Sequence, residues 1–396
     1  MLAPCGGWMS RFAVLAQPHR GQVRITGIKA MMLRGHSNTL IKVETDAGLA
    51  GYGEAGTNGA FARTRIDLLK PLLVGQDPLA IERLFHQMTV QTHPYLANIP
   101  TVSGIDIALW DLAGKITGLP VSRLMGGPFR DQIRLYINSA PKDMLDAPAC
   151  RDWAAEVKSS PHKWTGIKID IMRAAGKPVA QETPMLTSAE LSRVEKGFAN
   201  AREALGSEID LMVHCHNEFD LASSIGIARA VEPVRPMWLE DPLPVRWSES
   251  WLALRRAARV PILTGEKLEL AAGFQPFLDH QAVDLIQPDL AFAGGLTGAR
   301  KIADLAALYR IPIATHNVGS IVLTMASAHF GAAIHDFVIS ENVIGQGRLV
   351  EQMGAAGPPE VNAGFLKVPQ LPGLGADPRA EILRANLAEG EPWWGG

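Results

Sequence analysis

Short apolar runs in the region after residue 160 end repeatedly in an ionisable residue. From His214 onward, these residues follow one another at intervals of 23 to 27 residues. One strand–helix unit takes about that length, so the side chains fall at the same height on successive strands of a barrel. Charged groups are rarely buried without partners, and chance does not account for so many of them at strand ends. The residues are Lys168, His214, His216, Glu240, Glu266, Asp289, His316 and Glu341.

Two of these residues form a candidate metal site. Glu240 and Glu266 end neighbouring runs, and Mg²⁺ favours oxygen ligands such as a pair of carboxylates. Taken alone, Glu240 could instead be an acid that begins a helix before Asp241-Pro242. The pair therefore indicates a divalent cation only in the context of the whole series.

Three further residues of the series could move protons or bind an anion. Asp289 and His316 lie one strand apart, so the carboxylate could orient the imidazole and raise its basicity. Taken alone, His316 could be a core histidine bonded to a backbone carbonyl. Lys168 at a strand end indicates either a cation near a substrate carboxylate or a base with a lowered pKa.

The stretch LMVHCHNEFD (211–220) places His214 and His216 on either side of Cys215. Imidazole and thiolate are preferred zinc ligands, so a zinc site is one interpretation. Side chains alternate along a strand, so the two histidines point to one side and Cys215 points to the helix layer. The alternation therefore weakens the interpretation as a zinc triad.

The elements that would position these residues are strands of a parallel barrel. Between the apolar runs lie helix-like segments such as AELSRVEKGFANAREAL and GLTGARKIADLAALY. Barrel strands are buried on both faces and read as apolar runs, with catalytic groups at their C-terminal ends. The sequence thus predicts a (β/α)8 barrel. Its strands are IRLYINS, GIKIDI, DLMVHC, MWLED, PILTGE, VDLIQPDL, IPIATHN and FVISEN.

The rest of the chain divides around this barrel. Strand-like runs followed by helical patterns predict an α+β capping domain over residues 23–130, with the barrel at 131–350. Residues 1–22 are expected to be a disordered leader. The Gly- and Pro-rich segment 351–396 is expected to pack on the capping domain.

Composition excludes several classes of partner. A net charge of −2 provides no global attraction to nucleic acid or to a membrane surface. No apolar run reaches the roughly 18 residues of a membrane helix. Three scattered cysteines make no disulfide framework, as expected in a reducing cytosol. We therefore expect a cytoplasmic protein whose partner is a small molecule.

Several motifs resemble the enolase superfamily, and within it the mandelate racemase/muconate lactonizing enzyme-like group that includes acid-sugar dehydratases. The resemblance runs from about residue 23 to the end of the chain. It implies a modified (β/α)8 TIM barrel with an α+β capping domain, Mg²⁺ at the barrel mouth and a homo-oligomer. The motifs are GYGEAG, SGIDIALWDLAGK, GIKID, WLEDP, TGEKL, QPDLAFAGGLTGARKIA, ATHNVGS and SEN.

The resemblance also implies roles for individual residues. Glu240 and Glu266 match metal ligands, and Asp289–His316 matches a dyad that removes the proton next to the substrate carboxylate. Glu341 matches an acid that hydrogen-bonds that carboxylate. Metal and cations would stabilise the resulting enediolate, since a base alone cannot ionise so weak an acid.

Two positions depart from the family pattern. Lys168 matches the first lysine of a Lys-x-Lys pair, but the second position is Asp170. A carboxylate with an ordinary pKa of about 3.9 is a poor base, so racemisation is disfavoured. The first metal ligand of the family is Asp, and His214 stands in its place. Imidazole suits Mn²⁺ or another divalent metal better than Mg²⁺, so metal preference could shift.

His216 points to the reaction type. In members like D-galactonate dehydratase, a histidine two residues after the Asp ligand protonates the departing β-hydroxyl, which suits an imidazole of pKa near 6.5. The alternative is a partner that only orients His214. Arg34 and His36, in a loop between two strands, could contact the polar part of a sugar acid or only the solvent. Asp170 is a further candidate for substrate contact.

The leading hypothesis is a metal-dependent dehydratase that converts an aldonate or aldarate to a 2-keto-3-deoxy acid. A second is a racemase or epimerase of a 2-hydroxy acid that uses Asp170 or Lys168 as the other base. A third is a non-catalytic ligand-binding relative whose metal site is altered at His214.

Overall fold

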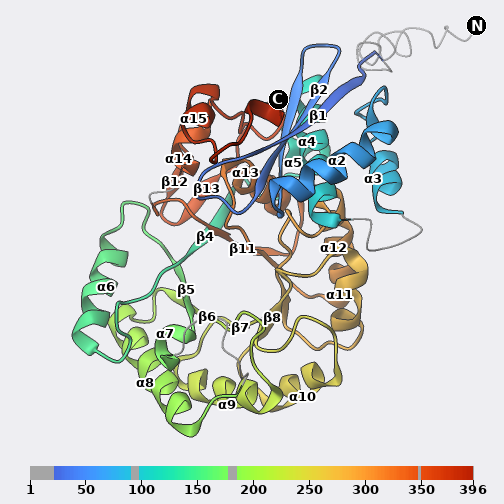
Figure 1. Ribbon diagram of the computed structural model, residues 1–396. Helices are drawn as coiled ribbons and strands as arrows, with labels where there is room; N and C mark the ends of the chain where they lie inside the picture. The colour runs from blue at the N-terminus through green and yellow to red at the C-terminus, as the bar shows by residue number, and fades with distance from the viewer. Residues whose placement is uncertain (1–21, 91–97, 177–184, 347–348, 396) are drawn as a thin grey trace, which may run out of the picture.

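The computed structural model describes residues 22–90, 98–176, 185–346 and 349–395. All but the last residue of the leader expected over 1–22 lies outside these residues. A small domain sits above a barrel whose helices surround the strands (Figure 1). This arrangement confirms the predicted TIM barrel with an α+β capping domain.

The capping domain pairs an antiparallel sheet, of order β1-β2-β3 in the described residues, with a long helix, α4. Gly51 and Gly53 allow this close packing, because a Cβ there would lie about 2 Å from carbonyl oxygens of α4. The helix ends at Gly118, whose φ of 73° is left-handed. A glycine at the end of the apolar pattern SGIDIALWDLAGKIT is a helix stop signal, so this end is predicted by the sequence. The elements are β1 (Ile25–Met32), β2 (Thr39–Thr45), β3 (Ala50–Ala55), α2 (Gly59–Leu73), α3 (Ile81–Thr89), α4 (Ile99–Thr117) and α5 (Val121–Leu124).

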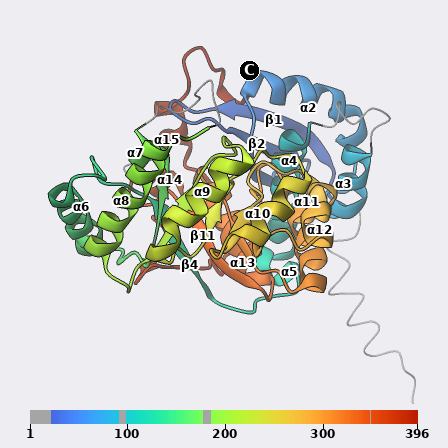
Figure 2. The ribbon, with the colours of Figure 1, turned by 90° about the horizontal axis from the view of Figure 1, so that it is seen from below.

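Among the described residues, eight parallel strands follow one another in chain order, and the pairing of the last with the first closes the barrel. Seven of them lie within the predicted runs, and β4 begins one residue before the run IRLYINS. Figure 2 shows the surrounding helices from below. The strands are β4 (Gln132–Asn138), β5 (Gly166–Asp170), β6 (Asp210–His214), β7 (Leu239–Glu240), β8 (Ile262–Thr264), β9 (Leu285–Ile286), β10 (Ile313–Thr315) and β11 (Phe337–Asn342). The helices are α6 (Ala147–Ser159), α7 (Met172–Ala175), α8 (Ser188–Leu205), α9 (Leu221–Val231), α10 (Glu249–Ala257), α11 (Leu270–Asp279), α12 (Gly295–Tyr309) and α13 (Ile321–Ala333).

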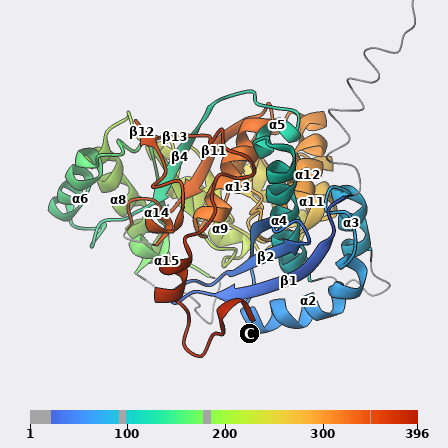
Figure 3. The same cartoon turned by 90° about the horizontal axis from the view of Figure 1, so that it is seen from above.

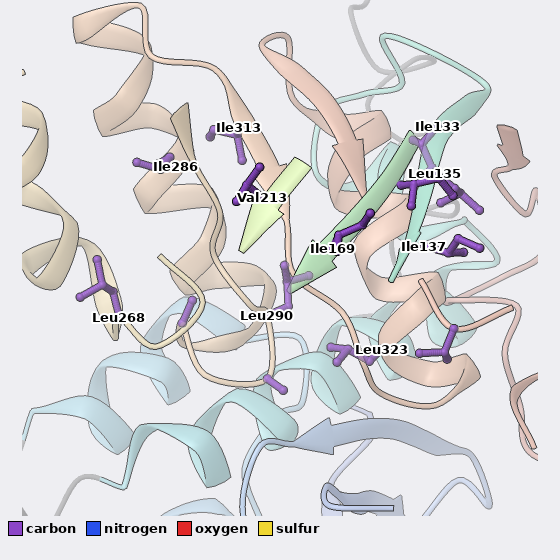
Figure 4. Close-up of a cluster of buried hydrophobic side chains, with 14 of the residues drawn as sticks. Ile133, Leu135, Ile137, Ile169, Val213, Leu268, Ile286, Leu290, Ile313 and Leu323 are labelled. Carbon is purple, nitrogen blue, oxygen red and sulfur yellow. The ribbon is translucent and has the colours of Figure 1, made fainter. Parts of the chain in front are cut away.

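Alternation along the strands separates two apolar layers. Val213, Ile286 and Ile313 belong to the large cluster between strands and helices (Figure 4). Met212 and Trp238 belong to a smaller cluster inside the barrel. Side chains two residues further along a strand point the same way, so the interior layer sets the direction of the strand-end residues that follow it.

The C-terminal segment ties the two domains together. β13 (Phe365–Lys367) pairs with β12 (Val361–Asn362) and with the barrel strand β4. Further on, Glu391 accepts a hydrogen bond of 2.6 Å from Arg63 of α2. Figure 3 shows α14 (Val350–Met353) and α15 (Ala380–Ala385) running from the barrel towards the sheet of the capping domain.

The capping domain contacts loops that follow barrel strands. Glu54 is buried and accepts hydrogen bonds from the backbone N–H and the hydroxyl of Ser320, at the start of α13. Asp106 of α4 accepts a bond of 2.9 Å from the N–H of Thr297 in α12. Both contacts lie beyond the C-terminal ends of strands, so the capping domain covers the barrel mouth. No helix of the described residues is long and apolar enough to cross a membrane.

Candidate active site

The predicted strand-end residues gather at the barrel mouth because of strand parity. His214 lies two residues after Met212, and Glu240 lies two after Trp238, so both follow interior side chains. Glu266 does not fit this alternation. Gly265, which precedes it, has a φ of 143°, and a Cβ at this position would lie 2.9 Å from the N atom of Gln287. This backbone conformation interrupts the alternation of side-chain directions, so Glu266 points to the opposite side from the one that alternation gives.

A buried lysine joins two of the predicted carboxylates. Lys168 Nζ lies 2.8 Å from Glu240 Oε1 and 2.9 Å from Glu341 Oε2. Trp238 donates to the other oxygen of Glu240 at 2.8 Å, and Tyr136 donates to Glu341 at 3.2 Å. Burial alone would lower the pKa of Lys168, but the adjacent carboxylates raise it above its ordinary value. Lys168 is therefore a fixed cation in this structure.

Next to this pair lies a group of buried atoms without hydrogen bonds. His214 Nε2 is 3.5 Å from Glu240 Oε1 and 3.6 Å from Glu266 Oε2, and both ring nitrogens of His214 lack a hydrogen-bond partner in the described part of the chain. Burial and the charge of Lys168 lower the pKa of His214 well below its ordinary value. The ring is neutral, as a metal ligand must be.

Glu266 holds a negative charge at the centre of the site. Burial by itself raises the pKa of Glu266, but the positive charges of His316 and Lys168 lower it to about 2. Its Oε2 atom is buried and has no hydrogen bond among the described residues. The pKa of Glu240 shifts in the opposite direction. Burial raises it to about 7, although the positive charge of Lys168 lowers it. A bound cation would relieve the repulsion between these two carboxylates.

The predicted Asp289–His316 dyad is present in the structure. His316 Nδ1 lies 2.6 Å from Asp289 Oδ2, and Asp289 Oδ1 accepts 2.7 Å from the N–H of Ala291. His316 Nε2 faces Glu266 at 3.5 Å and Glu341 at 3.6 Å. Burial alone would lower the pKa of His316, but Glu266, Glu341 and the Asp289 hydrogen bond raise it to about 10.

His216 has a carboxylate partner as well. Its Nδ1 atom lies 2.7 Å from Asp170 Oδ2, and its ring centroid is 3.8 Å from that of His214. The two histidines thus lie on one side, while Cys215 is buried in the outer cluster, as alternation predicts. Burial lowers the pKa of His216, but the hydrogen bond and charge of Asp170 outweigh it and raise the pKa above the ordinary value.

The turn that carries His216 depends on residues that sequence reasoning missed. His216 and Asn217 have φ of 54° and 65°, a left-handed conformation that is uncommon for residues other than glycine. Lys267 donates to the carbonyl of His216 at 2.8 Å and to Asn217 Oδ1 at 3.0 Å. The signal available in the sequence was the lysine in TGEKL, directly after Glu266.

Asp241 is a second residue that sequence reasoning missed. His214, Asp241 and Glu266 each offer one ligand atom, and these atoms lie within 4.8 Å of one another, a grouping that could hold a metal ion. Asp241 was considered only as part of the Glu-Asp-Pro sequence that could begin a helix. Its φ of 47° changes the direction of the chain, which simple alternation cannot foresee.

Arg34 and His36 lie in the loop between β1 and β2. Arg34 is exposed and donates to the carbonyl of Ala385 at 3.2 Å. His36 is half-buried, and its N–H donates to the carbonyl of Leu33. The contact of Arg34 ties the loop to the C-terminal segment, so substrate contact by either residue stays a prediction.

Comparison with known proteins identifies relatives over nearly the whole chain. Residues 26–126 match the mandelate racemase / muconate lactonizing enzyme N-terminal domain, and residues 150–382 match the enolase C-terminal domain-like family. D-xylonate dehydratase of Haloferax volcanii is 33% identical over 390 residues, covering 94% of this chain and 92% of that protein. D-galactonate dehydratase of Ralstonia nicotianae is 31% identical, with coverages of 89% and 92%. The crystal structure of a mandelate racemase/muconate lactonizing enzyme-like protein from Rubrobacter xylanophilus has a TM-score of 0.85 and 31% identity, with coverages of 94% and 99%.

Proposed function

The chain belongs to the mandelate racemase/muconate lactonizing enzyme family of the enolase superfamily, and we propose that it is a metal-dependent dehydratase of a sugar acid. It is an enzyme of the hydro-lyase type. The proposed product is a 2-keto-3-deoxy acid. The observation that carries the proposal is the presence of two Asp–His pairs beside one cluster of buried carboxylates.

The residues proposed to hold a divalent cation are His214, Glu240 and Glu266. They fit this role because the ring of His214 is buried and neutral. In addition, Glu266 has a buried oxygen that accepts no hydrogen bond from any described residue. A bound divalent cation would neutralise the substrate carboxylate and make the adjacent C–H more acidic. The imidazole in place of a carboxylate favours Mn²⁺ or another divalent metal over Mg²⁺.

Lys168 and Glu341 are proposed to position the substrate carboxylate. Lys168 is a buried cation fixed by two carboxylates, so it can stabilise negative charge as it develops on the carboxylate oxygens without rearranging. Glu341 lies between Lys168 and His316. We expect it to share a proton with the substrate carboxylate across a hydrogen bond.

His316 is the proposed base. Its Nδ1 atom is occupied by Asp289, so Nε2 is the atom that faces the interior of the site and can take the proton from the carbon next to the carboxylate. Proton transfer requires neutral imidazole. The charges that raise the pKa of His316 belong to Glu266 and Glu341. Glu266 is the residue assigned to the cation, and Glu341 is the residue assigned to the substrate carboxylate.

His216 is the proposed acid. Asp170 keeps the pKa of the ring above its ordinary value, which favours the protonated form that an acid needs. When the bond from the β-carbon to its hydroxyl breaks, the hydroxyl takes that proton from His216 and leaves as water. The enol that remains tautomerises to the 2-keto acid. Hydroxide is a poor leaving group, so elimination depends on this proton.

The epimerase hypothesis makes a different prediction. It requires a second base on the opposite face of the carbon and gives inversion without loss of water. Of the two candidates for that base, Asp170 lies 2.7 Å from His216, and Lys168 is paired with Glu240 and Glu341, so this geometry favours elimination. The hypothesis of a non-catalytic relative predicts no turnover with any sugar acid.

The test is a screen of aldonates and aldarates, beginning with D-xylonate and D-galactonate, for formation of a keto acid. Protein stripped of metal and reconstituted with Mg²⁺, Mn²⁺ or Zn²⁺ is compared in each assay. We expect dehydration that needs added metal, with Mn²⁺ at least as effective as Mg²⁺. Inversion of configuration without keto acid, or full activity of the stripped protein, would contradict the proposal. The expectations of a homo-oligomer and of a cytoplasmic location belong to the same proposal.

A further inference from the structure

The carboxylates at the barrel mouth differ in how their oxygens are used. Both oxygens of Glu240 are engaged, one by Lys168 and the other by the indole N–H of Trp238, each at 2.8 Å. Asp241, the next residue, is 1% exposed, and its Oδ2 atom has no hydrogen bond from any described residue. A buried carboxylate oxygen without a partner is costly. A positively charged partner beside His214 and Glu266 would offset the cost of burying this oxygen.

Neighbouring residues hold the rest of Asp241 in place. Thr264 donates to Oδ1 at 2.6 Å and so fixes the carboxylate plane. The left-handed φ of 47° turns the side chain away from the direction that alternation after Glu240 would give. The backbone is held on both sides: the N–H donates to Leu263, and the carbonyl accepts 2.7 Å from the N–H of Asn217.

The unpartnered atoms coincide with the group that could hold a metal. His214, Asp241 and Glu266 each contribute an atom within 4.8 Å of the others, and each carries a buried nitrogen or oxygen without a hydrogen bond in the described chain. Oxygen atoms and neutral imidazole are the ligands of Mn²⁺ and similar cations. The three residues therefore offer a preformed set of acceptors.

We propose that Asp241 is a direct ligand of the divalent cation and supplies the negative charge that is lost where His214 occupies the position of a carboxylate. The inference rests on the proposed function only in assuming a resident divalent cation. It adds a residue to the set His214, Glu240 and Glu266, and it explains how a site with one imidazole retains three carboxylates. The strained backbone at Asp241 then has a function, because it directs the carboxylate to the ion.

The test measures Mn²⁺ affinity of the metal-stripped full-length chain, by electron paramagnetic resonance of the free ion. Asp241→Asn, which keeps the size and the acceptor for Thr264, is expected to weaken Mn²⁺ binding at least about tenfold. It should also add one water ligand to the bound ion, measured by broadening in ¹⁷O-labelled water. Thr264→Val is the matched control, since it removes the hydrogen bond to Asp241 and keeps the carboxylate. It should change affinity by less than about threefold.

A second pair of variants tests the compensation itself. His214→Asp provides a carboxylate at the neighbouring position, so in that background Asp241→Asn should cost much less affinity than in the wild-type chain. If Asp241→Asn alone does not fold, the double variant His214→Asp/Asp241→Asn is measured instead. It must fold and bind Mn²⁺ within about threefold of wild type for the proposal to stand. Glu269→Gln, in the loop after the neighbouring strand β8, controls for the general loss of a negative charge.

Three results would overturn the inference. Asp241→Asn could bind Mn²⁺ as tightly as wild type, or Thr264→Val could weaken binding equally, or the affinity could fall without any additional water on the ion. The last two would make Asp241 a positioning residue rather than a ligand. Failure of the wild-type chain to bind Mn²⁺, Mg²⁺ or Zn²⁺ is a different outcome, because it removes the proposed metal dependence along with the inference.

Discussion

Two Asp–His pairs lie on opposite sides of the barrel mouth, one at β5–β6 and the other at β9–β10. The distances within the two pairs are nearly the same. Each histidine places Nδ1 2.6 or 2.7 Å from a carboxylate Oδ2. Each carboxylate also accepts 2.7 Å through Oδ1 from the N–H two residues ahead, of Met172 or of Ala291.

The pairs differ in how the chain holds the ring. Asp289 and His316 face each other directly in a parallel bridge, and their side chains are 0% and 13% exposed. On the other side Asp170 faces His214. His216 reaches back to Asp170 from a left-handed turn, and its side chain is 33% exposed.

This difference supports opposite proposed roles for the two pairs. The buried ring of His316 is fixed beside Glu266 and Glu341, where the carbon next to a bound carboxylate would lie. The more exposed ring of His216 stands on a turn where a β-hydroxyl could approach it and where water can leave. We infer that a rigid environment suits the proton abstraction and an accessible one suits the expulsion of water.

The largest effect is expected for His316→Asn. Without the base, both dehydration and exchange of the substrate α-proton with deuterated solvent should fall by about 10²–10⁴-fold, because general base catalysis contributes that much. Exchange measured by proton NMR and keto-acid formation give the two rates. Full turnover of this variant would remove the distinction between the pairs, since His216 would then suffice.

Asp289→Asn should have the next largest effect. The amide cannot stabilise the imidazolium or hold its tautomer, and partners that orient a catalytic imidazole are typically worth about 10–100-fold. We expect kcat for exchange and dehydration to fall together while KM changes little. An equal loss of thermal stability and of substrate affinity would show instead that Asp289 only supports the fold.

Asp170→Asn should cost about tenfold in dehydration and leave α-proton exchange near the wild-type rate. Asp170 raises the pKa of His216, and an acid must be protonated to act. The substitution lowers that pKa, so the alkaline limb of the dehydration profile should move to lower pH. A rate loss in exchange as well as in dehydration would contradict the separation of roles and would favour the substrate contact predicted from sequence.

The smallest effect is expected for Lys267→Met. Lys267 fastens the left-handed turn of His216 through two hydrogen bonds but is itself largely exposed. Partly exposed contacts of this kind are worth up to about 1 kcal/mol, so dehydration should fall no more than about fivefold. A much larger loss would mean that Lys267 contacts the substrate directly.

Much of this site could be predicted from the sequence because barrel geometry repeats. Regular spacing of apolar runs placed Glu240, Asp289 and His316 at the same height, and parity placed His214 and His216 on one side with Cys215 on the other. The stop of α4 at Gly118 followed from the same kind of local rule. Each of these predictions needs only periodicity and the order of strands.

The remaining features depend on contacts that periodicity does not encode. The phase change at Gly265 and the left-handed φ of Asp241 alter side-chain directions by a single backbone torsion. The pairing of Asp170 with His216 depends on a turn held by Lys267, across two loops. The contact of Arg34 with Ala385 joins segments some 350 residues apart in the chain, which no local pattern predicts.

The central claim is that the two histidines act in sequence, His316 as base and His216 as acid. The most direct measurement follows the C2 proton of a substrate sugar acid by NMR in deuterated water with the His216→Asn variant. We expect deuterium to replace this proton with retention of configuration while no keto acid forms. Keto-acid formation at the wild-type rate, or the absence of exchange in a folded variant that binds metal, would contradict it.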